Sequence, residues 1–520
     1  MQGLQRGACA IVGVAESDLG QVAPGMSALD LMAQATHRAL QDCGLSLRDI
    51  DGVFATTSQS RMPTLALCEY LGISPRYHDG TNIGGCSFMS MVAHAQMAIQ
   101  AGLCTIALIA YGSTQRSAGR ANVAAPDPNP HEAPYRPIYT ASSYALAAAR
   151  HMYEYGTTRE QLAEVAVAAR QWALHNPVAW EKTPLTVEDV LASRMVSHPL
   201  TVRDCCLVTD GGGAVVLTSL DRARDLPKKP VRVLGYGERS TNMSMTLVRD
   251  LTTTGAREAA ADAFAMAGIT LADIDVLQVY DSFTITVALT LEAMGFCGPG
   301  EALDFIAGGR IRPGGALPLN TSGGGLSYCH PGQFGILLLV EAVRQLRGEC
   351  GKRQVPDAAI AVGAGALERI AELIQPFRYI GRIILVVQAV DRRDLLARQT
   401  HQQRMLDAAG HAPGGEDIHQ AGRACLQIRR RQTFLTAFHR RQAEFRHRLA
   451  DQGGGNLTRV QRQPYSEADA DQHEEDKRNK IGKAHGRSLG SGSRGRDAFA
   501  GGRAGARLAV FASTMSVITP

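Results

Sequence analysis

Aromatic residues are scarce in this sequence, at 5% of the chain, which argues against a protein that binds nucleic acid by base stacking. The net charge of +5 is also small and does not amount to the basic footprint of a nucleic-acid-binding protein. None of the eleven cysteines forms a CxxC pair, and their number is odd. We therefore expect neither a disulfide framework nor a zinc ribbon in this chain, and a reducing cytoplasm fits best.

Long apolar runs are missing as well. No uninterrupted apolar stretch is long enough to span a bilayer, which predicts that the chain has no membrane span. The first residues, MQGLQRGACAIVGVAE, lead directly into a strand-like run with no secretory apolar region. We therefore expect a cytoplasmic protein.

What the sequence does contain is an internal repeat. Residues 39–53 read ALQDCGLSLRDIDGV, and residues 263–276 read AFAMAGITLADIDV. Gly44 corresponds to Gly268 at an offset of 224 residues, and the Asp-Ile-Asp triplets that follow keep the same offset. Each glycine follows an amphipathic helix pattern and suits the left-handed residue that ends a helix. Chance similarity between two helix ends is the alternative to a duplication.

Strand and helix patterns follow the same order in both copies. In the first copy we expect strands at 10–13, 53–54 and 106–110, with helices at 31–40 and 87–101. In the second copy we expect strands at 231–234, 276–279 and 359–362, with helices at 259–266 and 333–347. Strands that alternate with helices predict a mostly parallel sheet covered on both faces. Two copies predict pseudo-twofold symmetry, with loops of both halves meeting at one site.

The length of 520 residues and the 54 glycines agree with several domains and a large core. We predict a first half at 1–220, which ends in a strand at 204–218, and a second half at 228–375. Residues 111–200 are expected to form an inserted loop domain with its own helix at 159–174.

Four stretches resemble the thiolase superfamily, and most closely the sterol-carrier-protein-X-type thiolases and their lipid-transfer-protein relatives. They are NIGGCSFMSMVAHAQMAIQAG (82–102), DCCLVTDGGGAVVLTS (204–219), VYDSFTITVALTLEAMGFC (279–297) and PGGALPLNTSGGGLSYCHPGQFG (313–335). The resemblance spans residues 7–365. It implies a duplicated α/β fold of five layers (αβαβα), built from two βαβαβ-type halves, that acts on acyl-CoA thioesters.

The resemblance also implies roles for particular residues. His330, in the Tyr-Cys-His-Pro-Gly loop, matches the base or oxyanion-hole histidine, and its alternative is a structural histidine that caps a loop. Asp281, in Tyr-Asp-Ser-Phe, would orient the active-site loop. The remaining implied residues would bind substrate: Gly84, Gly85, Ser282, Asn320, Gly323, Gly324 and Gly325.

Cys86 falls at or next to the position of the thiolase nucleophile, at the start of a helix whose N-terminus would favour a thiolate. The bulky Phe88 and Met89 follow it, and a buried cysteine that only packs is the alternative. The second thiolase cysteine is not found, since the chain reads VGAGALERIAEL after the last strand.

Two tyrosines open another mechanism. Tyr280 and Tyr328 stand at positions comparable to those of the proton-handling tyrosines in thiolase-fold aldolases, and a structural role for each is the alternative. Three functions stay open: a thiolase that uses Cys86, a retro-aldolase that uses both tyrosines, and a non-catalytic carrier of acyl-CoA or lipid. The resemblance further implies coenzyme A as part of the substrate, no permanently bound cofactor or metal, a homodimer, and a partner with an OB fold and a zinc ribbon.

The amino-acid composition of the chain changes at residue 382. Seven of the fifteen histidines lie at 382–520, basic runs follow one another, and regular periodicity fades. Two interpretations remain, a disordered basic extension and a shift of reading frame near residues 350–375 that damages the last strand and its loop. The irregular spacing of the histidines argues against a metal site.

Overall fold

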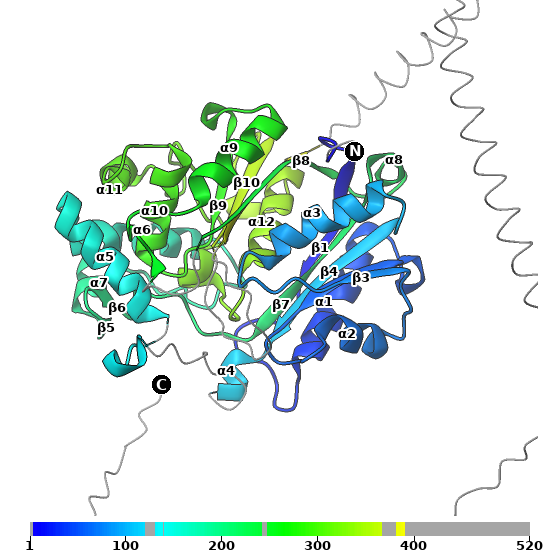
Figure 1. Cartoon of the computed structure of the whole chain (residues 1–520), viewed down its shortest axis with the longest axis horizontal. Helices are drawn as coiled ribbons and strands as arrows, with labels where there is room; N and C mark the ends of the chain where they lie inside the picture. Colours follow the sequence, from blue (N-terminus) through cyan, green and yellow to red (C-terminus); the bar gives the residue numbers. More distant parts are fainter. Residues whose placement is uncertain (1–3, 120–130, 139, 242–246, 367–380, 390–520) are drawn as a thin grey trace, which may run out of the picture. The chain divides into compact units, whose positions relative to one another are not determined.

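In the computed structural model, nine strands of the described residues join in one curled mixed sheet (Figure 1). The structure describes residues 4–119, 131–138, 140–241, 247–366 and 381–389, which all fall in one unit spanning residues 1–411. The strands of the sheet are β1 (Cys9–Glu16), β2 (Gly52–Thr56), β3 (Tyr77–Asp79), β4 (Ile106–Ser113), β7 (Gly211–Ser219), β8 (Val231–Ser240), β9 (Val276–Val279), β10 (Ile360–Ala366) and β11 (Gly381–Ala389).

The longer helices are α1 (Ala28–Cys43), α2 (Pro63–Leu71), α3 (Ser87–Gln100), α5 (Ala141–Tyr155), α6 (Arg159–Ala173), α9 (Ala256–Ala267), α10 (Thr284–Met294) and α12 (Gly335–Arg347). Five of these helices, α1, α3, α6, α9 and α12, lie at positions that the sequence predicts, whereas α2, α5 and α10 were not predicted. Shorter elements are α4 (Gln115–Ala118), α7 (Val187–Ala192), α8 (Leu220–Ala223), α11 (Ala302–Ile306), a π-helical turn (Gly324–Tyr328) and a two-stranded sheet of β5 (Met195–Ser197) and β6 (Leu200–Thr201). Within the described ranges, no helix has the length and apolar character to cross a membrane.

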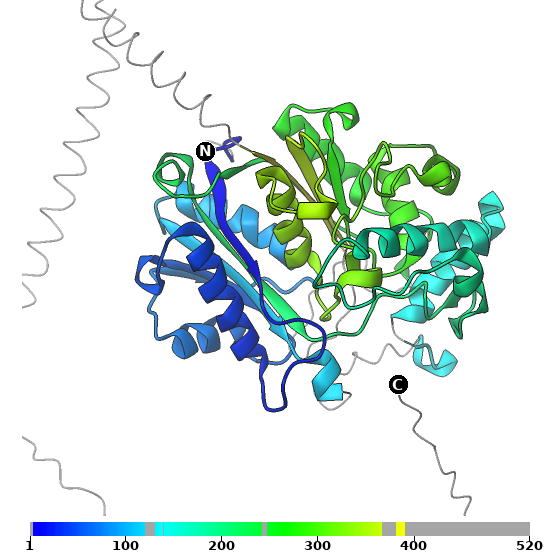
Figure 2. The same cartoon turned by 180° about the vertical axis from the view of Figure 1, so that it is seen from behind.

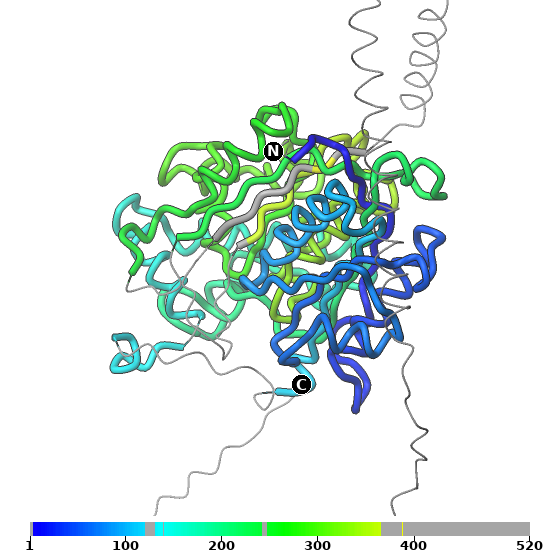
Figure 3. Tube along the Cα trace, turned by 45° about the vertical axis from the view of Figure 1, so that its right-hand side comes forward, coloured from blue at the N-terminus to red at the C-terminus, as the bar shows by residue number. Residues whose placement is uncertain are grey.

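Five layers form the fold, as the sequence predicts. α1 and α2 cover the outer face of the first half of the sheet, and α9 covers the outer face of the second half with α10 packed against it (Figures 1 and 2). α3 and α12 pack against each other between the two halves and touch strands of both. The halves join where β1 pairs with β8 (Figure 3).

The directions of the strands correct the prediction of a mostly parallel sheet. The order is β3-β2-β4-β7-β1-β8-β11-β10-β9, and within the described residues only β2 with β3, β2 with β4 and β9 with β10 pair in parallel. β7 runs against both β4 and β1, and β11 runs against both β8 and β10. Alternating strands and helices predict parallel pairing only where a crossover helix connects neighbouring strands. β7 follows β4 after the whole inserted segment, so that rule does not constrain its direction.

The repeat is visible in the local geometry. Gly44 ends α1 with a φ of 71°, and Gly268 ends α9 with a φ of 62°. After each glycine comes a one-turn 3₁₀ helix whose first turn closes with a capping box, on Asp49 in the first copy and on Asp273 in the second. Both copies therefore use the same left-handed glycine and the same cap, as expected for a duplication.

The inserted segment is fastened to the second half through a buried histidine. His151 on α5 is fully buried, with Nε2 at 3.1 Å from Glu292 on α10 and Nδ1 at 2.7 Å from the hydroxyl of Thr157. α6 occupies residues 159–173, close to the predicted range.

Two predicted boundaries differ from the structure. β7 begins at Gly211 rather than at 204, because the carboxylate of Asp204 closes a turn by accepting the backbone N–H and the hydroxyl of Thr201. β11 occupies residues 381–389 between β8 and β10, so the boundary placed at 382 falls inside a strand. The frame shift was placed near residues 350–375, and of that range residues 367–375 lie outside the described residues, as does the tail beyond residue 389.

Candidate active site

Tyr280 and His330 meet at the centre of the candidate site. His330 Nε2 lies 2.9 Å from Tyr280 Oη, and the two rings pack edge to face at 85°. Tyr280 Oη also accepts the N–H of Phe334 at 3.1 Å and lies 3.3 Å from the carbonyl oxygen of Gly332, to which it can donate. Tyr280 is fully buried and His330 is 4% exposed. The structure thus joins a phenol and an imidazole by a hydrogen bond away from bulk water.

Cys86 lies beside this pair. The ring of Tyr280 covers Gly85, where a Cβ atom would lie 2.0 Å from Tyr280 Cε2. Cys86 follows directly as the N-cap residue of α3, is fully buried, and donates its thiol to the carbonyl oxygen of Ile83 at 3.3 Å. Cys86 and His330 therefore lie around the same tyrosine, and their assignment to a single site is compatible with the geometry.

Asp281 holds the glycine-rich turn that leads to His330. Its Oδ1 accepts the N–H of Gly325 at 2.7 Å, and its Oδ2 accepts the N–H of Leu326 at 3.3 Å. Gly324 packs so closely on this carboxyl that a Cβ atom would lie 2.0 Å from Oδ2. Burial raises the pKa of Asp281 to about 7, although the backbone hydrogen bonds oppose the shift.

Ser282 and Asn320 bring buried donors to the site. Asn320 Oδ1 accepts the N–H of Val279 at 2.7 Å, and its backbone takes a φ of 51°. Among the described residues, Asn320 Nδ2 and Ser282 Oγ have no hydrogen-bond partner although both side chains are buried. Buried donors without partners are costly, so a ligand acceptor at these two atoms would stabilise the site. Gly323, by contrast, packs on Ala173 of α6, which indicates a structural role.

Tyr328 has different surroundings from Tyr280. Both rings pack edge-on against Phe334, at centroid distances of 6.4 Å for Tyr328 and 5.8 Å for Tyr280. Burial raises the pKa of Tyr328 well above its ordinary value, and the charged side chains that influence it include Glu16 and Arg344. His330 thus contacts Tyr280, and a joint role of Tyr280 and Tyr328 in handling the substrate proton stays a prediction.

Residues 204–210 contribute a part of the site that the sequence did not predict. Instead of forming a strand, this segment lies across the site loops: the N–H of Cys206 donates to Ser282, that of Leu207 to Gly325 and that of Thr209 to His330. Thr209 Oγ1 in turn accepts the backbone N–H of His330 at 2.9 Å. No sequence signal distinguished these backbone contacts from a strand pattern.

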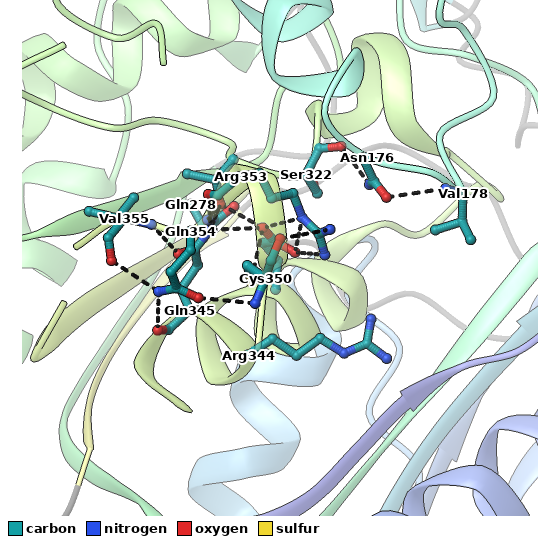
Figure 4. Close-up of polar contacts among 12 residues, drawn as sticks. Asn176, Val178, Gln278, Ser322, Arg344, Gln345, Cys350, Arg353, Gln354 and Val355 are labelled. Atoms are coloured by element: carbon teal, nitrogen blue, oxygen red, sulfur yellow. Dashed lines mark hydrogen bonds and ion pairs between the residues drawn. The ribbon is translucent and has the colours of Figure 1, made fainter. Parts of the chain in front are cut away.

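A buried polar network fastens the site loop to α12 (Figure 4). Glu341 pairs with Arg353 at 3.0 Å and accepts the hydroxyl of Thr321 at 2.7 Å. Gln278 and Gln345 donate to the same hydroxyl, each at 3.0 Å. Glu341, Thr321, Gln278 and Gln345 are all at most 3% exposed. This network supports the loop from behind, and its members are too far apart in sequence to be recognised from a motif.

A cavity of about 800 Å³ is lined by Glu16 and Arg344, two of the charged side chains that influence the pKa of Tyr328. It lies beside the part of β1 that follows Ile11, where β1 no longer pairs with β8. There side chains bind the free backbone groups of β1: Arg347 donates to the carbonyl of Val12, and Asp42 accepts the N–H of Val14. The cavity lining comprises Val14, Ala15, Glu16, Ser17, Asp18, Leu19, Arg38, Gln41, Asp42, Val178, Lys228 and Arg344, none of which was predicted as a site residue. No group of three or more potential metal ligands occurs in the part of the chain that the structure describes.

Comparison with known proteins places this geometry in context. Residues 237–368 match the family described as thiolase C-terminal domain-like. The chain is 34% identical over 371 residues to the acetyl-CoA acetyltransferase of Methanothermobacter thermautotrophicus, covering 68% of this chain and 94% of that protein. It is 34% identical over 380 residues to the steroid side-chain-cleaving aldolase of Thermomonospora curvata, covering 69% and 96%. The solved structure of an Ltp2-ChsH2(DUF35) aldolase superposes with a TM-score of 0.66 at 31% identity, covering 74% of this chain and 99% of that one.

Proposed function

Because this chain belongs to the thiolase superfamily, we propose that it is an enzyme that makes or breaks a carbon–carbon bond in an acyl-CoA thioester. The site supports best the aldolase form, in which a 3-hydroxyacyl-CoA is cleaved. The observation that carries this proposal is the hydrogen bond of 2.9 Å between Tyr280 Oη and His330 Nε2.

The proposed reaction begins with removal of the proton from the 3-hydroxyl group of the substrate. Tyr280 Oη takes this proton and passes its own to His330 Nε2. The C2–C3 bond then breaks, its electron pair forms the thioester enolate, and C3 becomes a carbonyl carbon. The proton held by His330 then returns through Tyr280 to C2 of the enolate, which completes the reaction and restores both groups. The N–H of Phe334, which donates to Tyr280 Oη at 3.1 Å, would stabilise negative charge on the phenol oxygen during the transfer.

The enolate oxygen needs hydrogen-bond donors that are already in place. Asn320 Nδ2 and Ser282 Oγ are buried donors with no partner among the described residues, so they are available to the thioester oxygen. Donors fixed in a site that excludes water stabilise such an oxyanion strongly. In this proposal Asp281 acts on the loop rather than on the substrate, because its carboxylate is occupied by two backbone amides.

A thiolase reaction is the second candidate, and Cys86 supports it. The thiol sits at the entrance of α3, next to the residue that Tyr280 covers. In this form Cys86 would attack a 3-oxoacyl-CoA and His330 would activate the thiol. A non-catalytic carrier of acyl-CoA or lipid is the third candidate.

Substrate and partners follow from the same proposal. Coenzyme A would enter as part of the substrate, and the acyl group would resemble a steroid side chain, as the name of the Thermomonospora relative states for that protein. The name of the solved relative joins an Ltp2 component to a ChsH2(DUF35) component, which supports a partner protein for this chain. We propose that this partner has an OB fold and a zinc ribbon. We also propose a homodimer.

The test is a turnover assay on 3-hydroxyacyl-CoA and, with added coenzyme A, on 3-oxoacyl-CoA, each with and without the partner. Tyr280→Phe should lower the rate of aldol cleavage by about 10²–10⁴-fold, the usual contribution of a general acid or base. Tyr153→Phe is the matched control, because the side chain of Tyr153 is 83% exposed. Cys86→Ala should leave aldol cleavage intact. Loss of activity in Cys86→Ala but not in Tyr280→Phe would replace the aldolase form by the thiolase form, and binding without turnover would favour the carrier.

A further inference from the structure

The turn that carries His330 is held by two tyrosine hydroxyls, one from each half of the chain. Tyr280, after β9, accepts the N–H of Phe334 and lies within reach of the carbonyl of Gly332. Tyr111, on β4, accepts the N–H of Gln333 at 3.1 Å and donates to the carbonyl of Pro331 at 2.6 Å. The two hydroxyls thus bind the same turn in the same manner, one residue apart.

Tyr111 is built into a rigid part of the first half. It is 1% exposed, it is paired with Thr56 of β2 on one side and Gly213 of β7 on the other, and its ring packs edge-on against Phe88 at 5.2 Å. The turn itself has less support of its own, since Gly332 takes a φ of 95° and carries no side chain. The strand that holds Tyr111 is therefore one of the elements that fix the turn, together with Tyr280 and Thr209.

We propose that Tyr111 is a positioning residue for the reaction, which holds the His330–Phe334 turn so that His330 Nε2 and the N–H of Phe334 reach Tyr280 Oη together. This inference rests on the proposed function, in which Tyr280 and His330 exchange the proton. Without the Tyr111 hydroxyl, a buried carbonyl and a buried N–H lose their partner, and the turn shifts to find others. A small displacement of a proton-transfer group costs a large factor in rate.

Tyr111→Phe tests this role because it removes one oxygen atom and keeps the ring on Phe88. The matched control is Tyr77→Phe, which also removes a hydroxyl from an aromatic that packs on a phenylalanine of the first half, away from the turn. We expect Tyr111→Phe to lower kcat for aldol cleavage by about 10–100-fold with little change in KM, because the turn positions the reacting groups. The pH profile of kcat should shift as well, since the contact of His330 with Tyr280 is altered. Unchanged kcat and an unchanged profile would overturn the inference.

A second measurement does not depend on turnover. In the full-length chain labelled with ¹⁵N-histidine, the ring signals of His330 can be assigned by their loss in His330→Gln. They should shift in Tyr111→Phe and not in Tyr77→Phe. If the wild-type protein does not cleave 3-hydroxyacyl-CoA, the proposed function fails, while the His330 signal still tests whether Tyr111 positions the ring. A His330 signal that is identical in Tyr111→Phe and wild type would refute the positioning role even where aldol cleavage is observed.

Discussion

Asp281→Asn tests the claim that this buried carboxyl carries a large electrostatic cost. Burial raises the pKa of Asp281 from 3.8 to about 7. Below about pH 4 the folded and unfolded states both bind the proton, so the group has no effect on stability. Between about pH 4 and 7 the unfolded state releases the proton while the folded state retains it, and the free energy of unfolding falls. About three pKa units at about 1.4 kcal/mol each give a cost of about 4 kcal/mol above pH 7.

Asparagine at position 281 cannot titrate. Comparing the variant with wild type over a range of pH therefore separates the pH-dependent cost of the buried carboxyl from the constant effect of a lost hydrogen bond. The asparagine retains an oxygen for the N–H of Gly325 and loses the acceptor for Leu326, which is a constant penalty at every pH. The difference in unfolding free energy between Asp281→Asn and wild type should therefore rise by about 4 kcal/mol in favour of the variant from pH 4 to pH 8.

The assay is urea unfolding of both proteins at intervals from pH 3 to pH 8. Asp273→Asn is a control of opposite sign: hydrogen bonds from the backbone and hydroxyl of Thr270 lower the pKa of this exposed carboxyl. Asp273 therefore stabilises the fold above about pH 4 and loses this effect as the pH falls further, so its variant should be the less stable one near neutral pH. Parallel stability curves for Asp281→Asn and wild type between pH 4 and pH 8 would refute the reasoning.

Three further predictions follow from the packing around the site. Gly85→Ala should destabilise the fold by about 1–3 kcal/mol in urea unfolding, because the new methyl group overlaps the ring of Tyr280, and wild-type stability would contradict this contact. Arg353→Met should lower the free energy of unfolding by about 3–5 kcal/mol, because it leaves the buried carboxylate of Glu341 without its ion pair. Adding Glu341→Leu should restore most of this loss, and a double variant as unstable as Arg353→Met would argue against the pair. Alkylation of Cys86 by iodoacetamide, followed by mass spectrometry, should be at least about tenfold slower in the native protein than in urea, because the buried thiol reacts only after local opening; equal rates would show that it is accessible.

The sequence predicts the parts of this fold that local chemistry determines. The glycines at 44 and 268 end their helices in the left-handed conformation because a residue without a Cβ atom adopts it at little cost. The glycine pair before a helix pattern places Cys86 at a helix entrance, the family resemblance places His330 in its loop, and the structure brings both to Tyr280.

Features that depend on partners far along the chain were not predictable in this way. The direction of β7 is set by β1 and β4, and no pattern within β7 records it. The contact of Tyr111 with Gln333 joins residues 222 positions apart. β11 was missed for another reason: its apolar run, RIILVV, stands next to a long basic segment whose composition dominates any average over the region.

Tyr111, Thr209 and Gly85 each reach the turn around His330 across more than 100 residues of chain, and they come from the half that lacks the histidine. Contacts between residues so far apart in sequence form slowly, because the entropy of closing a large loop is lost before the contact contributes any stabilising free energy. We therefore expect the arrangement around His330 to form late in folding, and neither half supplies all of its contacts. A protein cut in the connection between β7 and β8 would regain its site only through association of the two fragments.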